Sequence, residues 1–133
     1  MSYAAIQSLL DAKLQQLSSL PTLQLENTRN VGQTGVAFSR ATLLPARATQ
    51  LTVGLNGRDQ RTGLYQVDLF YPIDSSTAAI NAMADEIIDN FPRGTALTDG
   101  TVTVHCQLCW RETGRRIEQF YSVPVMIQWS CID

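Results

Sequence analysis

Apolar side chains recur at every third or fourth position over residues 3–20, which is the spacing of one face of an α-helix. The members of this stripe are Tyr3, Ile6, Leu10, Leu14 and Leu17. Ser2 is a suitable N-cap for the helix, and Pro21 ends it. Over residues 22–40 the periodicity fades and polar residues accumulate, which predicts a long surface loop or extended arm of the kind that a partner orders.

The middle of the chain changes to the two-residue period of β-strands. Residues 41–47 and 49–55 predict strands or one broken strand, in which Pro45 confines the first part to an edge or a bulge. Residues 56–63 contain the Asn-Gly signal of a hairpin turn, and residues 64–72 then alternate as a strand. The side chains expected on one face of that strand are Tyr65, Val67, Leu69 and Tyr71.

A second amphipathic helix is predicted from the capping residues 74–76 to about Phe91, with Pro92 and Gly94 ending it. Its expected buried stripe is Ala79, Ile80, Met83, Ala84, Ile87, Ile88 and Phe91.

Two further strands are predicted in the last third of the chain, over residues 101–111 and from the polar turn at residues 112–116 to the C-terminus. Strict alternation places inward Val102, Val104, Cys106, Leu108 and Trp110 in the first, and Val123, Val125, Ile127 and Trp129 in the second. The succession of elements predicts one α+β domain over residues 1–133. We expect a mixed or mainly antiparallel sheet of four to five strands with two helices packed on one face.

Charged residues make up 17% of the sequence, against about a quarter in an average protein. A surface poor in charge is less protected against association. The formal net charge of −2 offers no clustered positive field for binding nucleic acid through its phosphates. All basic residues except Lys13 are arginine, which suits desolvated interfaces, although a GC-rich genome would produce the same bias.

No stretch reaches the roughly 20 apolar residues that span a bilayer, and the N-terminus lacks a secretory signal pattern. The three cysteines form an odd count, which favours a reducing cytoplasm during folding over a disulfide framework.

The pair Cys106 and Cys109 has the spacing of a redox or zinc motif. Strict alternation of a strand, however, turns side chains three positions apart to opposite faces. His105 and Cys109 would then share a face but lie roughly 13–14 Å apart, too far for a nucleophile pair.

The sequence also lacks the patterns of two other kinds of catalytic site, an acid–base pair of carboxylates and a phosphate-binding loop. The acidic residues Asp85, Glu86 and Asp89 fall on the polar side of the second helix, and no glycine-rich phosphate loop is present. We therefore predict a protein that is not an enzyme and that uses no metal or cofactor. A small enzyme dependent on Cys109 is the weaker alternative.

Arginines concentrate in the predicted loops 56–63, 92–95 and 112–116. If these loops are neighbours, their charges would suit inter-subunit ion pairs; the simpler explanation is that they aid solubility. The candidate inter-subunit or tail/neck interface residues are Arg58, Asp59, Arg61, Arg93, Arg115 and Arg116.

Five segments occur in an order that resembles the tail terminator (tail completion) proteins of long-tailed bacteriophages. They are R-A-T-L-L-P-A, T-G-L-Y-Q-V-D-L-F-Y-P, A-A-I-N-A-M-A-D-E-I-I-D-N, F-P-R-G-T and Y-S-V-P-V-M-I-Q-W. The likeness covers about residues 38–130, and its most specific part is the strand Gly63–Pro72 followed by the helix that ends in Phe91–Gly94.

The resemblance implies a structural virion protein that forms a ring, usually of six copies, on the head-proximal end of the tail tube. Such a ring ends tube polymerisation and presents a docking surface for the head connector or stopper. DNA passes through its lumen without specific binding, and no membrane is involved. The implied location is the tail neck of the virion, with assembly in the host cytoplasm. Another neck component, such as a head–tail joining or minor tail protein, is the alternative.

Overall fold

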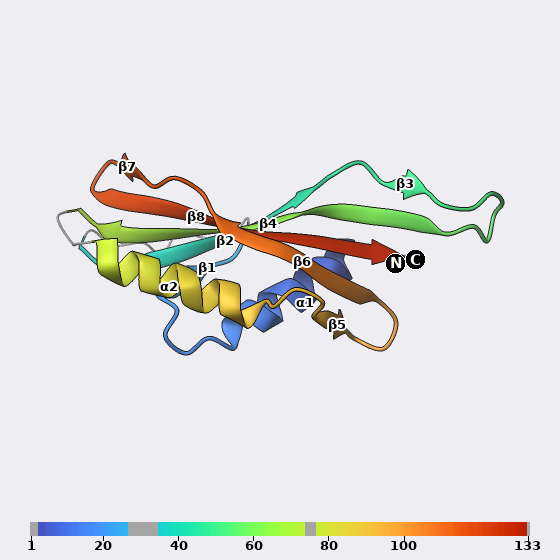
Figure 1. Ribbon diagram of the computed structural model, residues 1–133, viewed down its shortest axis with the longest axis horizontal. Helices are drawn as coiled ribbons and strands as arrows, with labels where there is room; N and C mark the ends of the chain where they lie inside the picture. The colour runs from blue at the N-terminus through green and yellow to red at the C-terminus, as the bar shows by residue number, and fades with distance from the viewer. Residues whose placement is uncertain (1–2, 27–34, 74–76, 133) are drawn as a thin grey trace.

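Two helices and eight strands make up the part of the chain that the computed structural model describes, residues 3–26, 35–73 and 77–132 (Figure 1). The elements in chain order are α1 (Tyr3–Gln15), β1 (Thr22–Gln24), β2 (Phe38–Pro45), β3 (Thr49–Gln50), β4 (Asp59–Pro72), α2 (Thr77–Asn90), β5 (Ala96–Thr98), β6 (Thr103–Arg111), β7 (Arg115–Ile117) and β8 (Phe120–Ile132).

The strands form one sheet in the order β1-β2-β4-β8-β6-β5, in which β3 also pairs with β4 and β7 with β8. The β1–β2 pair is parallel and the other pairs are antiparallel, which confirms the mixed, mainly antiparallel sheet. The predicted count of four to five strands is wrong. Strands β1, β3, β5 and β7 are only two or three residues long, too short to show a two-residue period.

Strands β4 and β8 form the centre of the sheet. They pair continuously from Gln60 opposite Ile132 to Pro72 opposite Phe120. At the rise of a β-strand, the 14 residues of β4 span roughly 45 Å. This length carries the β3–β4 hairpin to one end of the molecule and the β7–β8 hairpin to the other (Figure 1).

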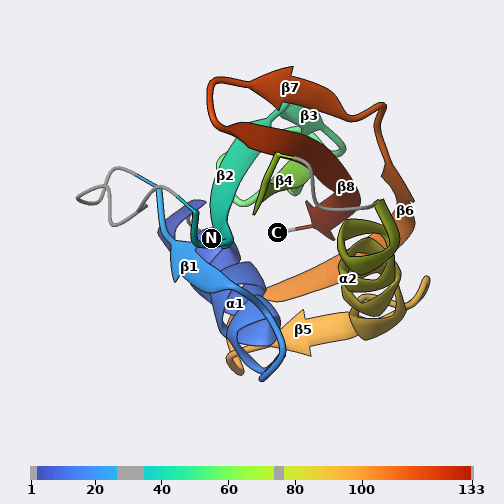
Figure 2. The same cartoon turned by 90° about the vertical axis from the view of Figure 1, so that its left-hand side faces the viewer.

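Both helices pack against the same face of the sheet, which curls around them (Figure 2). The helical stripes join the alternating residues of β4 and β8 in one hydrophobic cluster. Its fully enclosed members, with 0% exposure, include Ile6, Leu10, Leu14, Tyr65, Val67, Ile87, Val123, Val125, Ile127 and Trp129. The predicted inward faces of β4 and β8 are confirmed, as are the buried positions of α2 other than Ala79, which is exposed.

The first helix is shorter than predicted, because α1 ends at Gln15. The chain then winds in tighter turns, in which the Leu17 and Leu20 amides donate to carbonyls three residues earlier. Leu17 and Leu20 still pack against the core, so a continuous apolar stripe concealed the change. The proposed caps Ser2 and residues 74–76 lie outside the described residues.

The predicted loop at residues 22–40 is partly a strand region, since β1 and the start of β2 lie within it and residues 27–34 are outside the described part. The Ser39 hydroxyl donates to the Pro21 carbonyl at 3.0 Å. The Glu26 carboxylate accepts from the Leu43 amide at 2.8 Å. These bonds hold residues 21–26 along β2.

Strand β6 departs from strict alternation at a bulge between Cys106 and Cys109, where its register against β8 shifts. Val102, Val104 and Cys106 are buried as predicted, but Leu108 is 50% exposed and Trp110 is not part of the core. The bulge resets the phase, so Cys109 packs on the same hydrophobic cluster as Cys106. The predictions that the two cysteines face opposite sides and that Cys109 shares a face with His105 are therefore wrong.

Candidate interaction surfaces

The turn of the β3–β4 hairpin, residues 51–58, is called the tip here. The sequence predicted a strand to residue 55, but β3 ends at Gln50 and the tip forms an ordered turn instead. The Arg58 carbonyl accepts from the amides of Leu51 at 2.8 Å and Thr52 at 3.1 Å, and the Arg58 amide donates to the Thr52 hydroxyl at 2.5 Å. Gly54 has a φ of 107°, which favours glycine.

Three aliphatic side chains of the tip lie in solvent. Leu51 is 45% exposed, Val53 is 93% exposed and Leu55 is 106% exposed. Burying a side chain of this type is worth roughly 1.5–3 kcal/mol, which the folded chain does not gain here. An ordered turn that presents uncovered aliphatic groups is typical of a contact surface.

A second uncovered region lies along β6. Strand β5 pairs with β6 only up to His105, and residues 94 and 95 bond to Cys106. Beyond Cys106, within the residues that the structure describes, no strand pairs with the outer edge of β6 over residues 107–111. Open strand edges are common sites of pairing with another chain.

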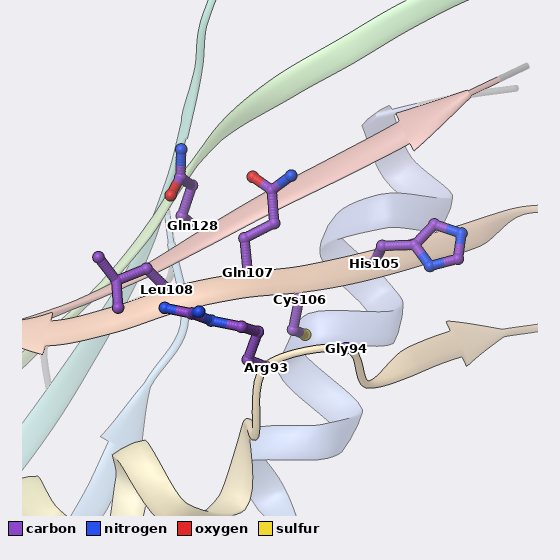
Figure 3. A pocket seen from close by; sticks show the side chains of 7 residues that line it. All are labelled: Arg93, Gly94, His105, Cys106, Gln107, Leu108 and Gln128. Atoms are coloured by element: carbon purple, nitrogen blue, oxygen red, sulfur yellow. The ribbon is translucent and has the colours of Figure 1, made fainter.

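Beside this edge is a hollow of about 440 Å³. It is lined by Arg93, Gly94, His105, Cys106, Gln107, Leu108 and Gln128 (Figure 3). A smaller hollow of about 270 Å³ lies next to it and shares Arg93, Gln107 and Leu108. The exposed Leu108 therefore borders both hollows.

The sheet face away from the helices carries a stacked aromatic group. The rings of Phe38 and Phe70 lie 4.5 Å apart, with Phe120 edge-on to both, and the Arg40 guanidinium sits 5.0 Å from the Phe70 centroid. Burial raises the pKa of the neighbouring Asp68 carboxyl, against the opposing influence of a hydrogen bond from Gln66 and the charges of Arg40 and Arg115. This group packs β2, β4 and β8 together where no helix covers them.

The six predicted interface residues do not lie on neighbouring loops. Arg58 is in the tip and Asp59 begins β4 next to it, whereas Arg115 and Arg116 are on β7 at the opposite end of the molecule (Figure 1). Arg93 follows α2 and borders the two hollows. Within one subunit the six residues are therefore spread from the tip to β7 and do not gather in one charged cluster.

Arg61 differs from the other predicted interface residues. It is half-buried on β4 rather than in a loop, and its guanidinium lies 4.7 Å from the ring centroid of Tyr3. This contact ties the start of α1 to the sheet. Packing on Tyr3 therefore accounts for the position of the Arg61 side chain.

The thiols of Cys106 and Cys109 are poorly suited to nucleophilic chemistry. Burial raises the pKa of each to about 11, so both stay protonated at neutral pH. His105 is exposed, and the bulge turns Cys109 away from its face. The described residues contain no group of three or more His, Cys, Asp or Glu side chains arranged to hold a metal ion.

A buried polar contact joins α1 to the sheet: the Tyr65 hydroxyl donates to the Asp11 carboxylate. Burial raises the pKa of Asp11, more than the Tyr65 hydrogen bond lowers it, and nearby Glu26 raises it further. Burial and Asp11 also raise the pKa of Tyr65. Because this pair lies between helix and sheet, it orients α1 and makes no reactive site.

Sequence reasoning missed Val53, Leu55 and Leu108, the most exposed apolar groups near the tip and the β6 edge. The signal at residues 51–55 was an alternation that could equally belong to a strand. Gly54 within that alternation was the available clue, because glycine interrupts strands. Leu108 could not be found, since a bulge leaves no mark in the alternation.

None of the described helices is long and apolar enough to cross a membrane.

Comparison with known proteins agrees with the earlier resemblance. The model of the family described as "Phage tail terminator protein" matches residues 4–129. One solved structure shares the fold with a TM-score of 0.78 at 20% sequence identity, over 98% of this chain and 96% of that one. No curated protein matches the chain significantly. The chain therefore belongs to the phage tail terminator protein family, structural proteins of the bacteriophage tail.

Proposed function

We propose that this protein acts as a single domain and closes into a ring of six copies on the head-proximal end of the tail tube. The ring ends tube polymerisation and offers the docking surface for the head connector or stopper. The observation that carries the proposal is the match to the terminator family over nearly the whole chain.

The arrangement of the subunit supports this role. Ring closure by head-to-tail contacts requires two different patches on each subunit. The candidate residues Arg58 and Asp59 lie at one end of the molecule, and Arg115 and Arg116 at the other. Patches so far apart suit contacts with different neighbours.

The chemistry of the helix-free sheet face also fits a passage for DNA. Besides the aromatic group and the cross-strand pair Arg40 and Asp68, the face presents uncharged polar side chains, including Thr42, Thr62, Gln66 and Gln128. Neutral groups attract phosphates weakly, so DNA would slide past such a lining. We propose that this face borders the lumen.

The test is to add purified protein to tails that lack their terminator and to measure tail length and ring formation by negative-stain electron microscopy, with light scattering for the free protein. We expect a ring on the end nearest the head and no further growth of the tube. Binding only to the capsid connector would instead indicate another neck component. A protein that neither binds nor caps tails contradicts the proposal.

A charge-reversal pair refines this test. Arg115→Glu combined with Arg116→Glu should reduce ring formation, because the reversed charges can no longer form the proposed inter-subunit ion pairs through these arginines. Arg47→Glu, at an exposed arginine between β2 and β3, is the matched control and should cap tails normally. Equal behaviour of the two variants would remove Arg115 and Arg116 from the interface.

A further inference from the structure

We propose that the tip of one subunit docks on the outer edge of β6 in a second copy of this chain, with Val53 and Leu55 seated against Leu108 and the hollow beside it. This inference rests on the proposed ring and names one of its contacts. Each subunit carries both parts of the contact: the tip, called the donor here, and the outer edge of β6 with its hollows, called the acceptor.

The donor is already ordered and exposed in the single subunit. Its hydrogen bonds from Leu51 and Thr52 to the Arg58 carbonyl hold the tip in shape without a partner. Val53 and Leu55 are almost fully exposed on that ordered turn. Little conformational entropy is therefore lost when the tip binds, which favours affinity.

The acceptor offers apolar surface and space together. Leu108 is half-exposed at the border of two hollows, and the larger one, at about 440 Å³, falls in the roughly 300–1,000 Å³ range of small binding pockets. Figure 3 shows Leu108, Gln107 and Gln128 projecting on the side of β6 where the hollow opens.

The two features cannot meet within one chain, because the hairpin runs away from the body of the sheet (Figure 1). A second copy can bring its β6 edge to the tip of the first. Repetition of this contact from subunit to subunit generates a head-to-tail ring. The charges at the hollows are of both signs, since Asp89 lines the smaller hollow and would attract Arg58 of the tip, whereas Arg93 lines both hollows. The pairing therefore rests on the aliphatic groups of the tip and Leu108.

The small area of the contact determines whether it can form between free subunits. An eight-residue turn buries far less than the roughly 800 Å² per partner of a stable complex. The contact should therefore be weak between free subunits and persist where neighbouring contacts or the tube hold them together.

Site-directed cross-linking tests the pairing. One batch carries Val53→Cys and a second carries Leu108→Cys, and the two are mixed on tails with a short bis-maleimide. The native Cys106 and Cys109 thiols contribute little background because burial keeps them protonated. We expect a covalent dimer from the mixture and a ladder of multimers from the double variant.

The matched control replaces Leu108→Cys by Val36→Cys, whose side chain is also 50% exposed. That mixture should give at least about tenfold less dimer. Rings that cap tails without the Val53–Leu108 link would overturn the contact and leave the terminator role standing. Cross-linking of the tip to a tube or connector subunit would also overturn it. The link without capping would support the contact and contradict the terminator role.

A double-mutant cycle provides the second measurement. Loss of one aliphatic contact should lower assembly roughly tenfold or more, for Val53→Asp and Leu108→Asp alike. If they share one contact, the double variant should be scarcely worse than either single variant. Fully additive losses in variants with unchanged circular dichroism would show that the two residues act at separate places.

Discussion

The helix-covered face of the sheet and the tip of the β3–β4 hairpin are both rich in aliphatic side chains, but only the covered face buries them within the chain. Val67 on the covered face is 0% exposed, whereas Val53 at the tip is 93% exposed. The covered face is stabilised by burial within the chain. The tip keeps its shape through hydrogen bonds of its backbone and of the Thr52 hydroxyl. Apolar residues of the covered face therefore stabilise the fold, whereas those of the tip are left for the association that we propose.

The same substitution at both valines gives the sharpest test. Val67→Asp places an unpaired charge in the core and should lower the free energy of unfolding by about 5 kcal/mol or more, enough to abolish cooperative unfolding in many domains. Val53→Asp should change it by no more than about 0.5 kcal/mol. Urea denaturation followed by circular dichroism measures both. Comparable losses would mean that the tip is part of the folded core.

The two tryptophans extend the comparison to large side chains. Trp129 is fully buried on the helix side, so Trp129→Ala should leave a cavity and cost about 3–5 kcal/mol. Trp110 is only half-buried, and its indole donates to the Glu112 carboxylate at 2.9 Å. Trp110→Ala should cost about 1 kcal/mol, and a larger loss from it than from Trp129→Ala would reverse the assignment of the faces.

The Asp11 carboxyl lies between α1 and the covered face, and it makes the stability of the protein depend on pH. Because its pKa is raised in the folded state, the folded chain holds its proton more tightly than the unfolded chain. Stability from this group is thus full below the unfolded value of 3.8 and is lost as pH rises through the folded pKa.

Asp11→Asn keeps an acceptor for Tyr65 and removes the charge. We expect it to stabilise the protein at neutral pH by less than about 1 kcal/mol, since solvent screens a partly exposed carboxyl, and to have no such effect near pH 3. Thermal unfolding across pH measures this, with Asp85→Asn on the exposed side of α2 as control. A stabilisation that persisted at pH 3 would exclude the charge as its cause.

The smallest effect is expected from the thiols. Cys109→Ala should leave tail capping unchanged, since the proposed contact is centred on Leu108 and the Cys109 thiol points to the Phe91 carbonyl. In the folded protein at pH 7.5, Cys106 and Cys109 should react with a thiol reagent at least about tenfold more slowly than in denaturant, because both are protonated and shielded. Loss of capping by a folded Cys109→Ala variant would revive the enzyme alternative.

The long elements could be predicted from the sequence because each buries one regular face. Val123 to Trp129 in β8 and Ile80 to Ile87 in α2 repeat with the period of their own backbone. The short strands could not, since two or three residues contain no period and their pairing depends on long neighbours. The bulge in β6 was hidden for a related reason, because an added residue reverses the faces without altering the pattern of residue types.

The interface was harder to predict than the fold. The arginines were chosen for their charge, yet Arg61 packs on Tyr3, and the others are spread over the molecule. Which of them meet depends on the neighbouring subunit, about which a single chain contains only indirect information. The exposed Val53 and Leu55 became visible as candidates only when the end of β3 was known.

The enclosure of the three cysteines has a consequence for the particle rather than for the subunit. A virion released by lysis passes from a reducing cell into aerated surroundings, where exposed thiolates oxidise to sulfenic acids or to mixed disulfides. Cys106 and Cys131 are about 1% exposed, and the thiol of Cys109 points to the Phe91 carbonyl at 3.3 Å. We therefore expect the buried Cys106 and Cys131, and to a lesser degree the half-buried Cys109, to resist oxidation when tails are stored in air.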